Sequence, residues 1–167
     1  MSNPLVLIIM GSDSDLSVME EGAKVLAEFG VPYEMRISSA HRSPRRTAEL
    51  AAGAAGRGIR VIIAGAGMAA HLAGVIAAET SLPVIGVPMG GSTLHGLDAL
   101  YSTVQMPAGI PVATMAIGKA GAKNAGIFAV QILALGDPLL MEGLKAFRER
   151  IAREVEEKDL ALQGAGK

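Results

Sequence analysis

Short runs of apolar residues alternate along the chain with longer segments in which apolar residues recur every three or four positions. A near-continuous apolar run predicts a strand buried on both faces of a parallel sheet, and the longer period predicts an amphipathic helix. Repeated strand–helix units imply an α/β fold with a doubly wound sheet and right-handed crossovers. The predicted strands are Leu5–Met10, Tyr33–Ile37, Val61–Ala64, Val84–Val87 and Val112–Ile117, and the predicted helices lie near 17–29, 44–57, 68–80, 96–105 and 120–135.

Capping signals mark several helix ends. Ser17 and Glu20 match a capping box, and Ser43 stands as an N-cap before a proline at the first helical position. A last helix begins at Asp137-Pro138 and carries one apolar stripe. We therefore predict a single domain over residues 1–167, with a core at about 5–135, a C-terminal helix at about 137–159 and a frayed tail at 160–167. Glycines suited to C-caps follow the first two helices, at Gly30 and Gly58.

Composition narrows the class of protein. Half of the 167 residues are hydrophobic (50%), which excludes an intrinsically disordered chain. The formal net charge is -1 and no strongly basic patch is present, so we expect no nucleic-acid or membrane partner. The absence of cysteine excludes disulfides and thiolate metal sites. No signal-peptide pattern opens the sequence, and we expect a cytoplasmic protein.

The middle of the chain is poor in charge. Between Val61 and Gly118, only Glu79 and Asp98 are charged. The segment 61–78 is long enough to cross a membrane, but glycines interrupt it and its start is β-branched, which indicates a buried strand, a turn and a helix. This much apolar surface exceeds what a lone small domain usually hides, so we expect a homo-oligomer.

Three loops that follow predicted strands contain candidate functional residues, because ligands of open α/β sheets bind beyond the carboxyl ends of the strands. In the first loop, Ser12, Ser14 and backbone amides at a helix start can hold an anion. Asp15 would repel phosphate and suits ribose hydroxyls better. Ordinary helix capping explains any one of these residues equally well.

In the second loop, Arg42 lies beside serines, among them Ser39, at a helix N-terminus, a combination suited to phosphate. His41 can titrate near neutral pH, as a carrier of protons must. A solvated surface pair is the alternative interpretation, which their position at the binding edge disfavours.

In the third loop, Gly65 and Gly67 let a ligand approach the backbone, but no third glycine completes a dinucleotide-binding fingerprint. A histidine at an apolar helix start, such as His71, is more often a core residue than a catalyst, so we assign it a supporting role. His95 ranks lower still, as a loop residue.

Together the loops predict one site for a small phosphorylated metabolite and proton-transfer chemistry with one histidine as acid and base. The scattered histidines and the absence of paired carboxylates argue against a metal. The absence of a Gly-x-Ser-x-Gly elbow argues against acyl transfer.

The loops resemble those of the class I mutases that act on N5-carboxyaminoimidazole ribonucleotide in purine biosynthesis. The resemblance covers roughly residues 5–150, and several motifs in the same order are far more specific than one. The matching motifs are Gly11-Ser12-x-Ser14-Asp15, Ser39-Ala40-His41-Arg42-Ser43-Pro44, Ala64-Gly65-Ala66-Gly67-x-Ala69-Ala70-His71-Leu72, and the run from Tyr101 through Met106-Pro107 and Pro111-Val112-Ala113-Thr114 to Asn124-Ala125.

The resemblance implies a flavodoxin-like, three-layer αβα fold, assembled as an octamer. It implies a reaction that moves a carboxylate from the exocyclic nitrogen of the imidazole to its ring carbon, without metal or organic cofactor. His41 would move the proton, and His71 with the backbone near Gly67 would line the pocket for base and carboxylate. The phosphoribosyl part would be held by Ser12, Ser14, Asp15, Ser39 and Arg42.

The chain departs from the family pattern at Ala73, where proline is usual, and at Met68, where glycine is common. One alternative is the class II enzyme, which carboxylates aminoimidazole ribonucleotide directly with carbon dioxide. That branch typically has lysine in place of Arg42 and an Arg-Ser-Asn segment in the third loop. A flavin-binding module of the same fold is disfavoured by only two tyrosines, three phenylalanines and no tryptophan. A signalling receiver module needs an aspartate at the end of the third strand, where this chain has Ala64-Gly65. A purely structural oligomer would not explain His41 and Arg42 at the binding edge.

Overall fold

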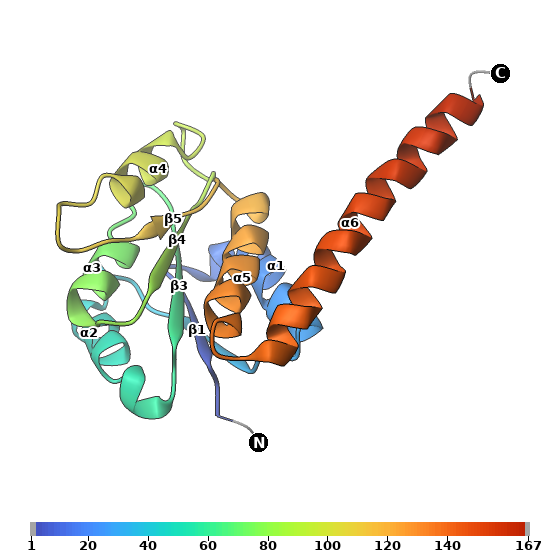
Figure 1. Cartoon of the computed structure of the whole chain (residues 1–167). Helices are drawn as coiled ribbons and strands as arrows, with labels where there is room; N and C mark the ends of the chain where they lie inside the picture. Colours follow the sequence, from blue (N-terminus) through green and yellow to red (C-terminus); the bar gives the residue numbers. More distant parts are fainter. Residues whose placement is uncertain (1–2, 166–167) are drawn as a thin grey trace. The chain divides into compact units, whose positions relative to one another are not determined.

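A computed structural model describes residues 3–165 and contains a five-stranded sheet in the order β2-β1-β3-β4-β5 (Figure 1). Every pair of neighbouring strands is parallel. The chain moves from β1 outward to β2, then crosses back to β3 and continues to β5, which is the doubly wound arrangement that we predicted. The strands are β1 (Val6–Met10), β2 (Tyr33–Ile37), β3 (Val61–Ala66), β4 (Val84–Pro88) and β5 (Ala113–Thr114).

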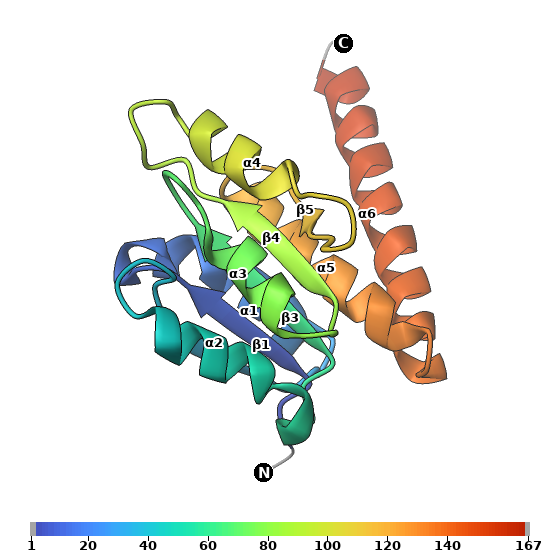
Figure 2. The same ribbon diagram turned by 90° about the vertical axis from the view of Figure 1, so that its left-hand side faces the viewer.

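Helices cover both faces of the sheet, as the two views show (Figures 1 and 2). Helices α2, α3 and α4 lie on one face, and α1 with the first part of α5 lies on the other. The helices are α1 (Leu16–Glu28), α2 (Pro44–Ala52), α3 (Leu72–Glu79), α4 (Leu97–Val104), α5 (Lys119–Ala134) and α6 (Pro138–Ala165), with short 3-10 turns η1 (Asp13–Asp15) and η2 (Ala55–Arg57).

The chain divides into two compact units, the first ending at Ala129 and the second beginning at Val130. The boundary falls inside α5, so the sheet and its loops belong to the first unit. Helix α6 continues to Ala165, beyond the end expected near residue 159. Residues 166–167 of the expected tail lie outside the described residues, and a single domain over residues 1–167 stays a prediction.

The core lies around the central strands. Every residue of β1 and β4, and all of β3 except Ala66, is buried, as the apolar runs predicted. The prediction of complete burial is wrong for β2, because β2 forms an edge of the sheet and leaves Tyr33 36% and Ile37 47% exposed. There Glu34 pairs with Arg57 and, at 3.6 Å, with Arg36. The other edge strand, β5, has only two residues instead of the predicted six-residue run.

Helix ends match the capping signals in part. Gly30 adopts a left-handed φ of 68° after α1, and the N–H of Val31 donates to the carbonyl of Leu26 at 2.8 Å, which is a Schellman-type end. The predicted capping box at Ser17 is wrong: α1 begins at Leu16, which puts Ser17 inside the helix. The hydroxyl of Ser12 caps the preceding turn η1 instead.

Two further helix boundaries differ from the prediction. The helix expected over 68–80 begins only at Leu72, because Met68 and Ala70 in the preceding loop have positive φ values of 56° and 32°. The helix expected over 44–57 ends at Ala52 and is followed by η2, whose C-cap is Gly58 with φ 91°. Within residues 3–165, no helix is long and apolar enough to cross a membrane.

Candidate active site

A cleft of about 620 Å³ lies beyond the carboxyl ends of the strands. The parallel register brings these ends together, since Met10 pairs with both Ile37 and Gly65, and Ala66 pairs with Pro88. The loops that follow β1, β2, β3 and β4 therefore converge on one place. The cleft lining includes every residue predicted for the site, namely Ser12, Ser14, Asp15, Ser39, His41, Arg42, Gly67 and His71.

The loop after β1 forms one side of the cleft. The hydroxyl of Ser12 accepts the N–H of Ser14 at 3.3 Å and donates to Oδ1 of Asp13 at 3.1 Å. The hydroxyl of Ser14 is 3.5 Å from Oδ1 of Asp15. Burial raises the pKa of Asp15 above its ordinary value, and the hydrogen bond from Ser14 partly opposes this effect. Asp15 is thus a partly desolvated hydrogen-bond acceptor beside two hydroxyls.

The loop after β2 supplies the positive charge. Among the residues that line the cleft, Arg42 is the only arginine or lysine and Asp15 the only carboxylate. Nη2 of Arg42 donates to the carbonyl oxygen of Gly11 at 3.1 Å, and its backbone N–H donates to Oγ of Ser39 at 3.2 Å. These contacts hold the guanidinium against the first loop, where a fixed fork of donors suits a phosphate group.

Two histidines from different loops meet in the cleft. Nε2 of His41 lies 2.9 Å from Nδ1 of His71, with the ring centroids 4.8 Å apart and the planes at 71°. One of these nitrogens must carry a hydrogen and the other a lone pair, so the contact couples the tautomers of the two rings. His71 immediately precedes α3 and lines the cleft in contact with His41, and the supporting role expected for it stays a prediction.

The loop after β3 brings backbone close to the cleft. A Cβ atom on Gly67 would lie 3.3 Å from Cβ of Met89, so a side chain there would compress the wall. Met68 is 69% exposed and adopts a left-handed φ of 56°, a conformation that glycine reaches at no steric penalty. The departure at Met68 therefore falls on a strained position of the cleft wall.

A fourth loop, after β4, was missing from the sequence-based list. Met89, Gly91 and Ser92 also line the cleft. Ser92 donates to Oδ1 of Asp98 at 2.7 Å and accepts the N–H of Gly96 at 3.3 Å, which braces this loop against the start of α4. The rule that identified the other loops, polar or small residues after a buried strand, applies here as well. His95 does not line the cleft.

The arrangement suits acid–base chemistry on a phosphorylated ligand. The imidazole of His41 and the guanidinium of Arg42 line the same cleft, with hydroxyls and a carboxylate on the facing loop. Among the described residues, no group of three or more His, Asp or Glu side chains is placed to hold a metal ion.

The sequence matches the AIR carboxylase family over residues 5–154. Curated relatives named N5-carboxyaminoimidazole ribonucleotide mutase include the Pyrococcus horikoshii protein, 58% identical over 98% of this chain and 91% of the relative, and the Thermotoga maritima protein, 57% identical over 98% and 94%. The Schizosaccharomyces pombe phosphoribosylaminoimidazole carboxylase is 56% identical, but the chain spans only 29% of it. The crystal structure of Treponema denticola PurE superposes with a TM-score of 0.84 at 31% identity, covering 93% of this chain and 96% of that one.

Proposed function

The chain belongs to the AIR carboxylase family, and we propose that it converts N5-carboxyaminoimidazole ribonucleotide into 4-carboxy-5-aminoimidazole ribonucleotide in purine biosynthesis. It would thus be an isomerase that moves a carboxylate within one molecule. The observation that carries the proposal is the convergence of His41, Arg42 and Asp15 on one cleft in a chain 58% identical to a named mutase. A proton carrier and an anion-binding group are both needed for this substrate.

The phosphoribosyl part would bind along the first two loops. Arg42, with its guanidinium held at Gly11, would neutralise the phosphate together with the hydroxyl of Ser39. Ser12 and Ser14 would add hydroxyl donors, and Asp15 would accept hydrogen bonds from the ribose. The imidazole would then extend towards the histidine pair and the backbone at Gly67.

Proton transfer by His41 would drive the reaction in two steps. His41 first donates a proton to the exocyclic nitrogen; the bond between this nitrogen and the carboxylate breaks, and its electron pair stays on the nitrogen, which releases carbon dioxide. The ring carbon of the aminoimidazole then attacks the carbon dioxide and forms the new carbon–carbon bond. His41 finally removes the proton from that ring carbon, so the histidine returns to its starting state. His71 and the small residues near Gly67 would keep carbon dioxide inside the cleft.

Direct carboxylation of aminoimidazole ribonucleotide by carbon dioxide is the second candidate, since relatives within this family differ in activity. Arg42 favours the mutase, because class II enzymes typically carry lysine at this position. The 56% identity to the Schizosaccharomyces pombe carboxylase does not favour class II, because the chain matches only 29% of that protein.

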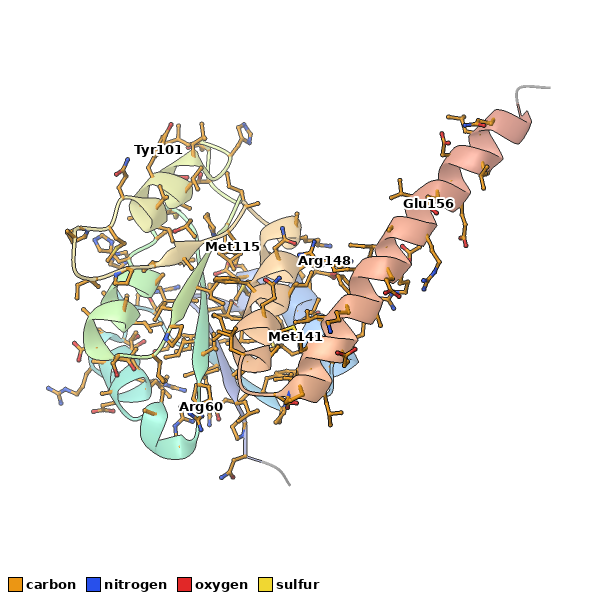
Figure 3. All side chains as sticks on the ribbon, viewed as in Figure 1. Arg60, Tyr101, Met115, Met141, Arg148 and Glu156 are labelled. Carbon is orange, nitrogen blue, oxygen red and sulfur yellow. The ribbon has the colours of Figure 1, made fainter. Side chains whose placement is uncertain are left out.

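The same proposal includes a cytoplasmic homo-octamer. Support for self-association comes from α4, where Leu97, Tyr101 and Val104 are 50%, 61% and 48% exposed. Their spacing of four and three residues places them on one side of the helix, on which Figure 3 labels Tyr101. Sedimentation of the purified protein measures the assembly directly, and a monomer at micromolar concentration would contradict this part.

The decisive experiment is an ultraviolet assay of the purified protein without ATP or metal. One reaction contains N5-carboxyaminoimidazole ribonucleotide and another contains aminoimidazole ribonucleotide with excess bicarbonate. Each is repeated with His41→Asn and with His95→Asn, a matched control outside the cleft. We expect rapid conversion of the first substrate, a loss of about 10²–10⁴-fold in the His41 variant, and no loss in the control. Efficient use of the second substrate alone would assign the carboxylase activity instead.

A further inference from the structure

Two buried hydroxyl groups lie behind the loop that presents His41 and Arg42, and neither lines the cleft. Ser38 directly follows β2 and is 1% exposed, and Thr47 lies in the first turn of α2 and is 0% exposed. Their oxygens are 2.8 Å apart. Buried hydroxyls of this kind are held in one arrangement by their hydrogen bonds, because an unpaired one is costly.

Each hydroxyl has one hydrogen to donate and can also accept. The hydroxyl of Thr47 reaches the carbonyl oxygen of Ser43 at 3.2 Å. At the 2.8 Å contact with Ser38 either hydroxyl can be the donor, and when Thr47 donates to Ser43 the donor is Ser38. The hydroxyl of Ser43 in turn donates to the carbonyl of Ser39 at 3.1 Å and accepts the N–H of Ser39 at 3.0 Å. A continuous chain of bonds thus runs from Ser38 through Thr47 and Ser43 to Ser39.

The bonds of Ser39 and Ser43 close a tight turn from which His41 and Arg42 project. The N–H of Ser43 also donates to the carbonyl of Ser39, at 2.8 Å. Ser38 is fixed on the sheet, since its N–H donates to the carbonyl of Met10 at 2.9 Å. The hydroxyl of Thr47 thus bridges the fixed end of the sheet and the far side of the turn.

We propose that Thr47 is a positioning residue, whose hydroxyl fixes the Ser39–Ser43 turn and so places His41 against His71 and Arg42 against Gly11. Thr47 does not line the cleft and would act only through the turn. The effect on catalysis rests on the proposed function, whereas the effect on the placement of His41 does not.

Replacing Thr47 with valine keeps the shape of the side chain and removes the bridge. The hydroxyl of Ser38 then loses its 2.8 Å partner and is left with Oγ of Ser43 at 3.5 Å. A bond to that atom would draw Ser43 away from Ser39 and shift the turn. Because small displacements of a catalytic group can reduce a rate by up to about 10²-fold, we expect kcat to fall on the order of tenfold and its pH profile to shift. Thr47→Ser retains the hydroxyl and should behave as the parent protein.

Thr103 provides a matched control. It is 3% exposed, and its hydroxyl donates to the carbonyl of Ala99, four residues earlier in α4, at 2.7 Å. Thr103→Val therefore removes a comparable buried hydrogen bond away from the cleft. We expect a comparable loss of thermal stability, with kcat, KM and the pH profile unchanged.

The test compares Thr47→Val, Thr47→Ser and Thr103→Val in the full-length chain, by kinetics and by NMR titration of isotope-labelled histidine. The three histidines give few signals, and that of His41 is identified from its loss in His41→Asn. We expect the His41 signal to change in position and titration only in Thr47→Val. An unchanged His41 signal there, or the same change in Thr103→Val, would overturn the inference.

If Thr47→Val does not fold, Ser38→Ala carries the same test, because it cuts the bridge at its other end and leaves the bond from Thr47 to Ser43 in place. Its His41 signal should change in the same direction by a smaller amount, and an unchanged signal would again overturn the inference. If the parent protein lacks mutase activity, the proposed function fails, whereas the NMR result still decides the role of Thr47.

Discussion

Gly121 lies buried in the first turn of α5, at a point where no side chain has room. A methyl carbon at this position would lie 1.6 Å from the carbonyl oxygen and 2.6 Å from the carbonyl carbon of Ala116. Real Cβ atoms essentially never approach other heavy atoms below 3.0 Å, so the backbone at Ala116 would have to retreat by about 1.4 Å, the difference between these distances. Gly121→Ala therefore tests a backbone contact that no rotation of a side chain can relieve.

The segment around Ala116 is held to the end of β4. The N–H of Met115 donates to the carbonyl of Gly86, and the N–H of Gly118 donates to the carbonyl of Pro88, both at 2.9 Å. Loss of these two bonds would lower the free energy of unfolding by about 0.5–1.5 kcal/mol each, and overpacking by a further 1–3 kcal/mol or so. The better helix propensity of alanine returns about 1 kcal/mol. The net loss is roughly 3 kcal/mol, or about 6–12 °C in Tm for a chain of this length.

Thermal and urea unfolding, followed by circular dichroism at one fixed protein concentration, measure this loss. Gly56→Ala is the control, because a Cβ atom on Gly56 meets nothing within 4 Å and its φ is not left-handed. We expect the control to unfold within about 0.5 kcal/mol of the parent protein. A Gly121→Ala protein as stable as the control would refute the close approach of α5 to Ala116 and the reasoning built on it.

Three further substitutions test the cleft. Asp15→Asn should raise Tm at pH 7, because burial raises the pKa of Asp15 and its ionised form therefore favours the unfolded chain. The gain should vanish below about pH 4, where Asp15 is protonated in both the folded and the unfolded state. An equal gain at pH 7 and pH 3 would contradict this reasoning. Arg42→Lys should raise KM about tenfold with little change in kcat, because one ammonium group cannot both contact the Gly11 carbonyl and bind a phosphate through two hydrogen bonds. An unchanged KM would exclude the role proposed for Arg42. Met68→Gly should raise the free energy of unfolding, measured with urea, by about 0.5–1 kcal/mol, because glycine adopts the left-handed φ of 56° without strain. Met68→Ala keeps the strain and should give no gain.

The sequence was sufficient to predict the order of strands and helices and the convergence of three loops. This succeeded because apolar runs report burial and because parallel strands put their carboxyl ends at one edge. The run Tyr33–Ile37 was grouped with the buried strands, although Glu34 and Arg36 alternate with its apolar residues, a pattern typical of a strand that is not buried on both faces. Its place at an edge follows from strand order, which is set by packing between distant segments. The local pattern therefore predicts the strand, and the alternation that indicates its exposure was overlooked.

Other features depended on three-dimensional contacts. His41 and His71 are separated by 30 positions, and only the fold shows that their nitrogens meet at 2.9 Å. Ser17 offered a good local cap, but the chain starts α1 one residue earlier because η1 leads directly into it. The bridging role proposed for Thr47 depends on hydrogen bonds that composition and spacing do not encode.

Both borders of the sheet discourage further strands. On one side, β2 carries Glu34 among paired arginines, and charged side chains on a border strand disfavour the pairing of another chain. On the other side, β5 offers only Ala113–Thr114. Copies of this protein would therefore associate through helices and side chains, and not by joining their sheets. This protects a chain rich in apolar residues against aggregation through edge-to-edge strand pairing.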